Sequence, residues 1–99
     1  MVKEKELNCL QTISDVLSEN VNPNYYSLNG YKEEAVCIEK GKDYWQVFSA
    51  ERNNRFDVAS FDTVVEACLC LIHRVCPKRE EGLLLKNEFL DRIVSTRIA

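Results

Sequence analysis

Apolar residues recur at steps of three and four residues near the start of the chain, at Leu7, Leu10, Ile13, Val16 and Leu17. This spacing lines one side of an α-helix, so it predicts a first helix from about Lys3 to Glu19. Asn and Pro residues follow at positions 20–24, and they indicate the end of the helix because Pro cannot continue it and Asn tolerates the left-handed conformation.

Beyond this helix the pattern changes to alternation, which is typical of β-strands. Residues 34–39 carry apolar side chains on both faces, and residues 44–50 alternate aromatic and β-branched residues with others. Residues 55–59 predict a third strand at the edge of the sheet, with Phe56 and Val58 pointing inward and Asp57 outward. Polar turns join the three strands into an antiparallel meander, and Tyr25 to Leu28 suggest a short additional strand before the Asn29–Gly30 turn.

Helical spacing returns in the last part of the chain. Ser60, Asp62 and Thr63 are alternative N-caps for a second helix, and Glu66 three residues after Thr63 matches a capping box. Its apolar stripe runs to Val75, and Cys76 with Pro77 ends it. A third helix is predicted from about Glu80 to Thr96, with Gly82 weakening its first turn.

The order helix–strands–helix–helix predicts an α+β fold in a single domain, residues 1–99. Its antiparallel meander sheet of three to four strands is packed by helices mainly on one face. If Trp45 and Val47 pack under the helices, then Tyr44, Gln46 and Phe48 lie on the opposite face. If these side chains are exposed on that face, they form an interaction surface. If the first or third helix covers them, they belong to the core.

Composition narrows the class of protein. With 45% hydrophobic and 29% charged residues, the chain is expected to fold alone as a globular domain. It has no apolar run long enough to span a membrane and no signal-like start, so we predict a cytoplasmic protein that does not bind membranes. Five Cys residues are an odd number, and Cys37, Cys68 and Cys70 lie inside apolar segments, which favours reduced buried thiols for most of them. The net charge of −3 argues against nucleic acid as a partner.

The alternatives to a binding protein are a zinc site and an enzyme active site. Cys68, Cys70, His73 and Cys76 are all potential zinc ligands. On one helix, however, they point in different directions and cannot surround one ion, so no metal or other cofactor is predicted. An enzyme would need the sole histidine, His73, as a base beside a nucleophile such as Cys37. Without a phosphate loop or paired-carboxylate motif, the prediction is that the protein is not an enzyme.

The segments EAVCIEK, YWQVFSAERN and FDVASFDTVVEACLCLIHRV lie within residues 34–75. Together they resemble the small immunity proteins encoded beside bacterial polymorphic or contact-dependent toxins. The corresponding motif residues here are Trp45, Val47, Glu51, Arg52 and Phe61. The resemblance implies a stoichiometric inhibitor that binds the C-terminal domain of its cognate toxin, for example a nuclease, in the cytoplasm.

The expected partner-binding residues are the outward residues of the meander and its loops. They combine acidic side chains, which favour a basic partner, with aromatic anchors. They are Asp43, Tyr44, Gln46, Phe48, Glu51, Arg52, Asn53, Asn54 and Asp57. The alternative function is a regulatory or assembly module that uses the same surface to form a homodimer.

Overall fold

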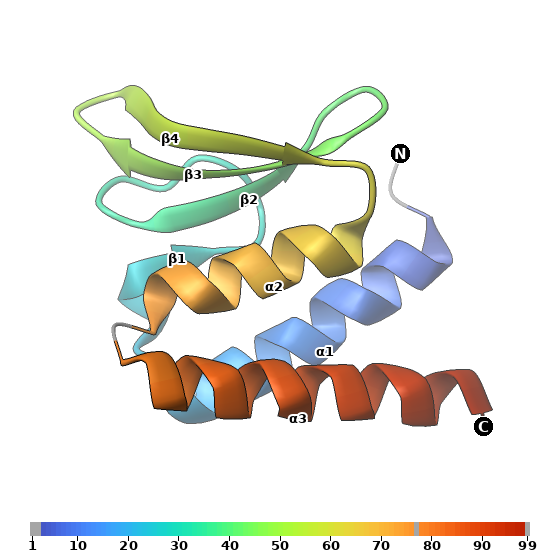
Figure 1. The fold of residues 1–99 in the computed structure, drawn as a ribbon. Helices are drawn as coiled ribbons and strands as arrows, with labels where there is room; N and C mark the ends of the chain where they lie inside the picture. The colour runs from blue at the N-terminus through green and yellow to red at the C-terminus, as the bar shows by residue number, and fades with distance from the viewer. Residues whose placement is uncertain (1–2, 77, 99) are drawn as a thin grey trace.

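The computed structural model of the protein describes residues 3–76 and 78–98, with side chains described as far as Val94. These residues form three α-helices and a four-stranded sheet in the expected order of helix, strands, helix, helix (Figure 1). The α+β prediction is therefore confirmed. None of the helices in the described part of the chain is long and apolar enough to cross a membrane.

The first helix, α1, spans Glu4–Asn20 and buries Ile13, Val16 and Leu17 of the predicted stripe, together with Cys9. Leu7, which the spacing also placed in the stripe, is 54% exposed. The chain then forms a short 3₁₀ helix, η1, over Pro23–Tyr25. The Asn22 side chain accepts a hydrogen bond of 2.9 Å from the Asn24 N–H and caps this turn.

The sheet contains β1 (Tyr26–Ser27), β2 (Val36–Lys40), β3 (Trp45–Glu51) and β4 (Asn54–Phe61), in that spatial order. The strands β2, β3 and β4 form the predicted antiparallel meander. The short β1 pairs with β2 in the parallel direction, so the sheet is mixed and not purely antiparallel. The physical reason is that residues 28–35 do not make a hairpin but cross over the sheet before β2 begins.

Three layers follow from these elements. The helix α2 (Val64–Val75) lies against the sheet. The helices α1 and α3 (Arg79–Ile98) lie on the side of α2 that faces away from the sheet (Figure 1). Thr63 is the N-cap of α2, because its hydroxyl accepts a 3.2 Å hydrogen bond from the Glu66 N–H. The expected role of Pro77 in ending α2 lies outside the described residues. The main core fills the space between the sheet and the three helices, with Ile13, Leu17, Ile38, Trp45, Val47, Leu71, Ile72 and Phe89 among its members.

The opposite face of the sheet carries a second, smaller core. It contains Ala35, Cys37, Phe48 and Ala50, with Tyr31 packed against it. Phe48 was predicted to face solvent as a binding residue, but its side chain is fully buried. The cover comes from the 28–35 connection, whose Tyr31 ring stacks on Phe48 with centroids 6.4 Å apart, and not from the first or third helix.

In the edge strand β4, by contrast, residues that were expected to be buried are exposed. Phe56 and Val58 were expected to point inward, but they are 47% and 48% exposed. The register between β3 and β4 shifts between Val47 and Ser49, and Asp57 has a positive φ of 51°. This bulge re-aims the side chains around it, and β4 lies at the edge of the sheet.

Candidate protein-binding surface

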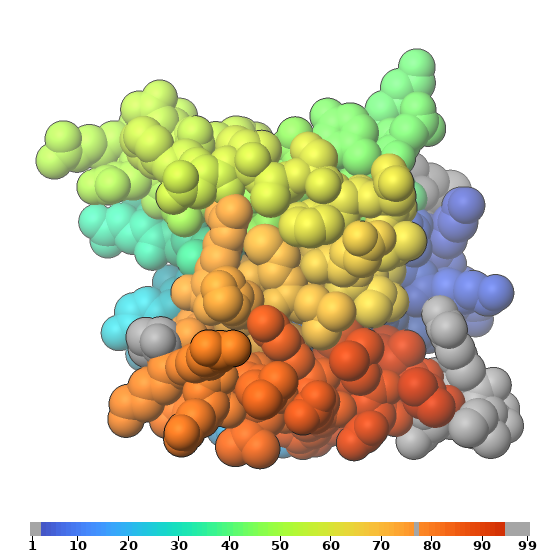
Figure 2. Space-filling view, in the orientation of Figure 1, coloured from blue at the N-terminus to red at the C-terminus, as the bar shows by residue number. Residues whose placement is uncertain are grey.

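Two adjoining hollows open where the β3–β4 hairpin, the C-terminal end of α2 and the start of α3 come together. Their volumes are about 520 and 540 Å³. Tyr25 and Val75 line both hollows, so we treat them as one feature and name it the end groove. Figure 2 shows the β3–β4 hairpin (yellow-green) projecting at the same side of the molecule as the end of α2 and the start of α3 (orange).

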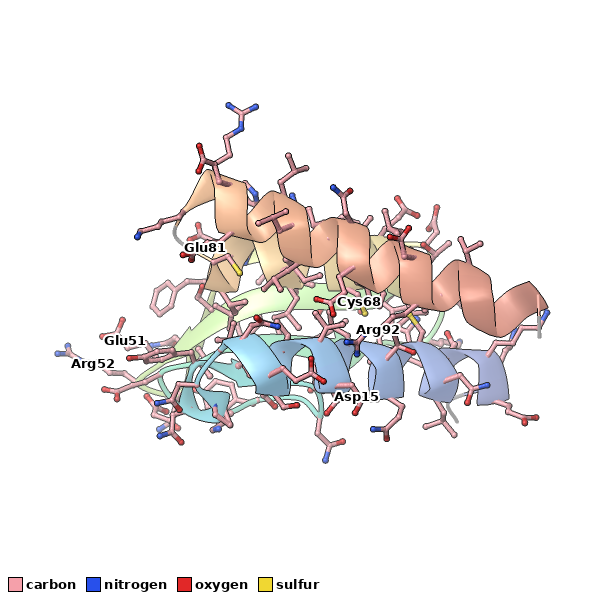
Figure 3. The ribbon with its side chains drawn as sticks, turned by 90° about the horizontal axis from the view of Figure 1, so that it is seen from below. Asp15, Glu51, Arg52, Cys68, Glu81 and Arg92 are labelled. Atoms are coloured by element: carbon pink, nitrogen blue, oxygen red, sulfur yellow. The ribbon has the colours of Figure 1, made fainter. Side chains whose placement is uncertain are left out.

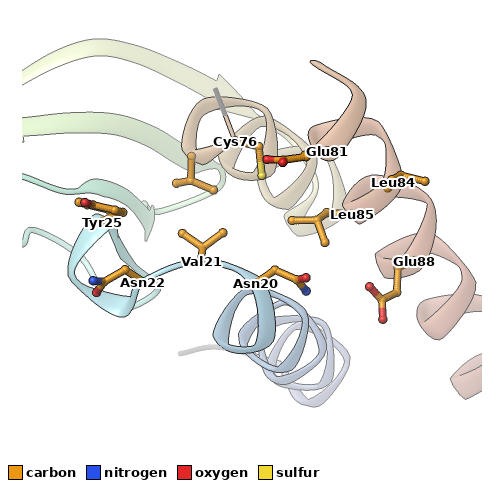
Figure 4. A pocket seen from close by; sticks show the side chains of 10 residues that line it. Asn20, Val21, Asn22, Tyr25, Cys76, Glu81, Leu84, Leu85 and Glu88 are labelled. Atoms are coloured by element: carbon orange, nitrogen blue, oxygen red, sulfur yellow. The ribbon is translucent and has the colours of Figure 1, made fainter. Parts of the chain in front are cut away.

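The large exposed apolar side chains of the end groove come from three separate elements. Tyr25 from η1 is 60% exposed, Phe56 from β4 is half exposed, and Leu84 from α3 is 69% exposed. Large apolar side chains that gather around a hollow and remain in water are typical of protein-binding sites. Figure 4 shows the helical half of the groove, where Val21, Cys76 and Leu85 lie between Tyr25 and Leu84.

Carboxylates surround this apolar floor. Glu34, Glu51 and Asp57 line the hollow next to the sheet, and Glu81 and Glu88 line the hollow next to α3. Among the described lining residues, Arg74 is the one Lys or Arg side chain. Its Nη2 donates a 2.6 Å hydrogen bond to the Asp57 carbonyl, which fastens the bulge of β4 to the end of α2. The groove is therefore acidic and favours a positively charged partner.

The β3–β4 hairpin is held in one conformation beside the groove. Its turn residues Arg52 and Asn53 have φ values of 51° and 65°, as a tight two-residue hairpin turn requires. The Glu33 carboxylate accepts hydrogen bonds from the Arg52 N–H and, at 2.9 Å, from the Tyr31 hydroxyl. The Tyr31 hydrogen bond, followed by the backbone ones, lowers the pKa of Glu33. The connection that covers Phe48 thus also supports the hairpin.

The nine predicted binding residues do not form one patch. Glu51 and Asp57 line the end groove, and Arg52, Asn53 and Asn54 form the exposed hairpin next to it. Asp43 and Tyr44 lie in the β2–β3 turn at the opposite end of the sheet (Figure 1), because successive hairpins of a meander alternate ends. The seven residues of β3 separate the two turns by about 20 Å. Gln46 is half-buried between them, and Phe48 is buried.

Tyr25, Phe56, Leu84, Arg74, Glu81 and Glu88 were missed as groove residues. For Phe56 the strand pattern was misleading, because the bulge cannot be read from alternation. One available signal was the run Leu83–Leu84–Leu85, which is wider than one buried helical stripe needs and so implies exposed apolar area.

The groups considered for catalysis or metal binding are separated from one another. Cys68 lies in the core with its Sγ 4.0 Å from the Sγ of Cys9, and this hydrogen bond and burial raise the pKa of Cys68. His73 is exposed on α2, with its Nδ1 3.4 Å from the Lys86 Nζ. Cys37 lies on the other face of the sheet, where burial raises its pKa. Within residues 3–76 and 78–98, no three His, Cys, Asp or Glu side chains converge on a possible metal position.

The chain matches no protein-family model, no curated protein and no solved structure.

Proposed function

We propose that this protein is a stoichiometric inhibitor that binds and neutralises a cognate bacterial toxin domain, and that the end groove is its binding surface. The observation that supports the proposal most directly is the pairing of exposed Tyr25 and Phe56 with a rim of carboxylates around one hollow. The resemblance of residues 34–75 to immunity proteins supplies the class of partner.

The composition of the groove suits protein recognition. Aromatic side chains supply large contact areas with few rotatable bonds, and they dominate the binding free energy of many interfaces. Tyr25 and Phe56 are anchors of this kind. The surrounding carboxylates accelerate encounter with a basic surface and disfavour acidic partners. A toxin domain that binds nucleic acid has such a basic surface, and the inhibitor would block it by occupying it.

The groove is also largely preorganised. Tyr25 lies in the Asn22-capped turn, Asp57 is tied to Arg74, and the adjoining hairpin is tied to Glu33. Ordering these segments before binding reduces the conformational entropy that association would otherwise cost. A non-catalytic inhibitor depends on a long-lived complex, so this rigidity supports a role in tight stoichiometric binding.

Co-purification with the toxin domain encoded beside this protein tests the proposal. The wild-type chain should form a 1:1 complex, and Tyr25→Ala with Phe56→Ala should weaken it by about 100-fold or more, measured by calorimetry. Tyr44→Ala is the matched control, because Tyr44 is an exposed aromatic at the opposite end of the sheet. Lack of any complex, or loss of it through Tyr44→Ala alone, would contradict the proposal.

A further inference from the structure

The helix α3 carries apolar residues on two sides. Leu85 and Phe89 are buried against the other helices, as expected for a surface helix. Leu83, Leu90 and Val94 lie on its outer side and are 58%, 37% and 52% exposed. The outer side of a surface helix is ordinarily polar, so this row needs a separate explanation. Figure 3 shows α3 lying beside α1 at the outside of the molecule.

The spacing of these residues is that of a coiled-coil seam. Leu83, Asn87, Leu90 and Val94 are separated by steps of four, three and four residues, which correspond to alternating d and a positions. The row is about 16 Å long at 1.5 Å per residue. We name it the α3 seam. It is distinct from the end groove, which takes Leu84, Glu81 and Glu88 from a different side of the same helix.

We propose that the α3 seam pairs with the α3 seam of a second copy of this chain, in parallel orientation about a two-fold axis. The exposed Asn87 argues for this partner and direction. In a parallel pair each seam residue meets its own copy, so the two Asn87 amides hydrogen-bond to each other across the axis. In an antiparallel pair, Asn87 would lie against Leu90 and its amide would lose hydrogen bonds.

The charges beside the seam agree with the same arrangement. Lys86 and Asp91 flank the seam on its two sides and are five residues apart. This is the spacing at which g and e positions of parallel helices face each other, so each Lys86 meets the Asp91 of the second copy. In the single chain the Lys86 Nζ makes an exposed contact with His73, which it can exchange for a carboxylate. The seam is thus complementary to itself in charge as well as in shape.

This dimer would leave the function of the end groove intact. The seam residues do not line the end groove, so pairing along the seam leaves both grooves open. Two helices that meet along one short row bury less than the roughly 1,600 Å² of a standard interface. We therefore expect a reversible dimer with a dissociation constant on the order of tens of micromolar.

Sedimentation of the full chain from about 5 to 500 µM tests the proposal. The average mass should rise towards that of a dimer, and Leu90→Glu should weaken the dimer by about 30-fold or more. Leu83→Glu, at the more exposed seam position, serves as a second variant if Leu90→Glu fails to fold. Leu7→Glu is the matched control, because Leu7 is a leucine on α1 whose exposure of 54% is close to that of Leu83. A monomer at all concentrations, or equal weakening by Leu7→Glu, overturns the proposal.

Oxidative cross-linking then tests the direction of the helices. In the parallel pair, Leu83→Cys places a thiol next to its own copy, so copper phenanthroline should produce a covalent dimer. The wild-type chain and Leu7→Cys, oxidised in the same way, report any contribution from the native cysteines. A dimer that cross-links only when Leu83→Cys is mixed with Val94→Cys is antiparallel and overturns the parallel arrangement. Since neither residue lines the end groove, these results are independent of toxin binding.

Discussion

Phe48 and Phe56 belong to neighbouring strands, yet one is fully buried and the other is half exposed. Phe48 lies on the outer face of the sheet, beneath Tyr31 and the Arg55 guanidinium, whose central carbon is 4.4 Å from the ring centroid. Phe56 lies in the end groove, beside a bulge in the edge strand. The exposure of a side chain on this sheet therefore depends on whether another segment crosses the same face, and not on the pattern of its own strand.

The largest expected effect is a difference in the free energy of unfolding between variants of these two residues. Phe48→Ala should lower the free energy of unfolding by about 3–5 kcal/mol, because it removes a buried ring and leaves a cavity. Phe56→Ala should lower it by less than about 1 kcal/mol, since the ring is already partly in water. Urea unfolding measures both. Equal losses would show that the two environments are not as different as their exposure indicates.

Removing the cover should convert the outer face into an open one. Tyr31→Ala should cost about 2–3 kcal/mol and expose Phe48, because the stacked ring is lost. Tyr31→Phe keeps the ring and removes only the hydrogen bond to Glu33, so it should cost less than about 1 kcal/mol. Unfolding curves and binding of a hydrophobic dye provide the measurement. Dye binding by Tyr31→Phe as strong as by Tyr31→Ala would contradict this account of the cover.

At the end of the sheet away from the groove, polar contacts join α1 to β2 and β3. There Glu6 of α1 accepts hydrogen bonds from Lys40 at 2.5 Å and from the Trp45 Nε1 at 2.9 Å. Lys40 is the main cause that lowers the pKa of Glu6 to about 2, against its usual 4.5. Glu6→Gln should cost about 1–2 kcal/mol at pH 7.

The pH dependence of that cost follows from the sign of the shift. Because the pKa of Glu6 is lower in the folded state, its contribution is complete above about pH 4.5 and is lost as the pH falls towards 2. The stability difference between wild type and Glu6→Gln should shrink over that window. A difference that stays constant from pH 7 to pH 2 would show that the ion pair is not its source.

Charge reversal at each end of the sheet should change the rate of toxin association by different amounts. Glu51→Lys, at the groove, should slow toxin association by about 3- to 10-fold at low salt, and less at high salt. Asp43→Lys introduces the same change at the opposite end and should have a smaller effect. Stopped-flow mixing measures both rates. A larger effect from Asp43→Lys would place the partner at the β2–β3 turn.

The smallest expected effect is local to the hairpin. The lowered pKa of Glu33 means that its carboxylate should keep its hydrogen bonds until the pH falls below the usual range for a glutamate. The amide chemical shift of Arg52 should titrate with that same low pKa, and Glu33→Gln should abolish the titration. An Arg52 amide that titrates unchanged in Glu33→Gln would assign the transition to another group.

Much of the fold was predictable because local rules apply to it. Helical spacing located all three helices to within one or two residues at most of their ends, and Thr63 with Glu66 marked the start of α2. The meander followed from alternation and its turn residues. The parallel β1–β2 pairing was not predictable, because a parallel pair depends on a crossing connection. Gly30 lies in that connection with a φ of 92°, which favours glycine.

The candidate site was less predictable, and the reason is physical. Alternation assigns Phe48 and Gln46 to one face, but it cannot say that Tyr31, distant in sequence, will cover the first of them. The end groove joins Tyr25, Phe56 and Leu84 from three elements, and the bulge at Asp57 exposes one of them.

The amino-acid sequence by itself therefore determined the helices, the meander and the main apolar side of α1 and α2. These depend on the spacing of apolar residues along one segment at a time. Only the tertiary structure decided which apolar residues outside that core are covered and which stay in water, because covering a side chain requires a second segment to arrive over it.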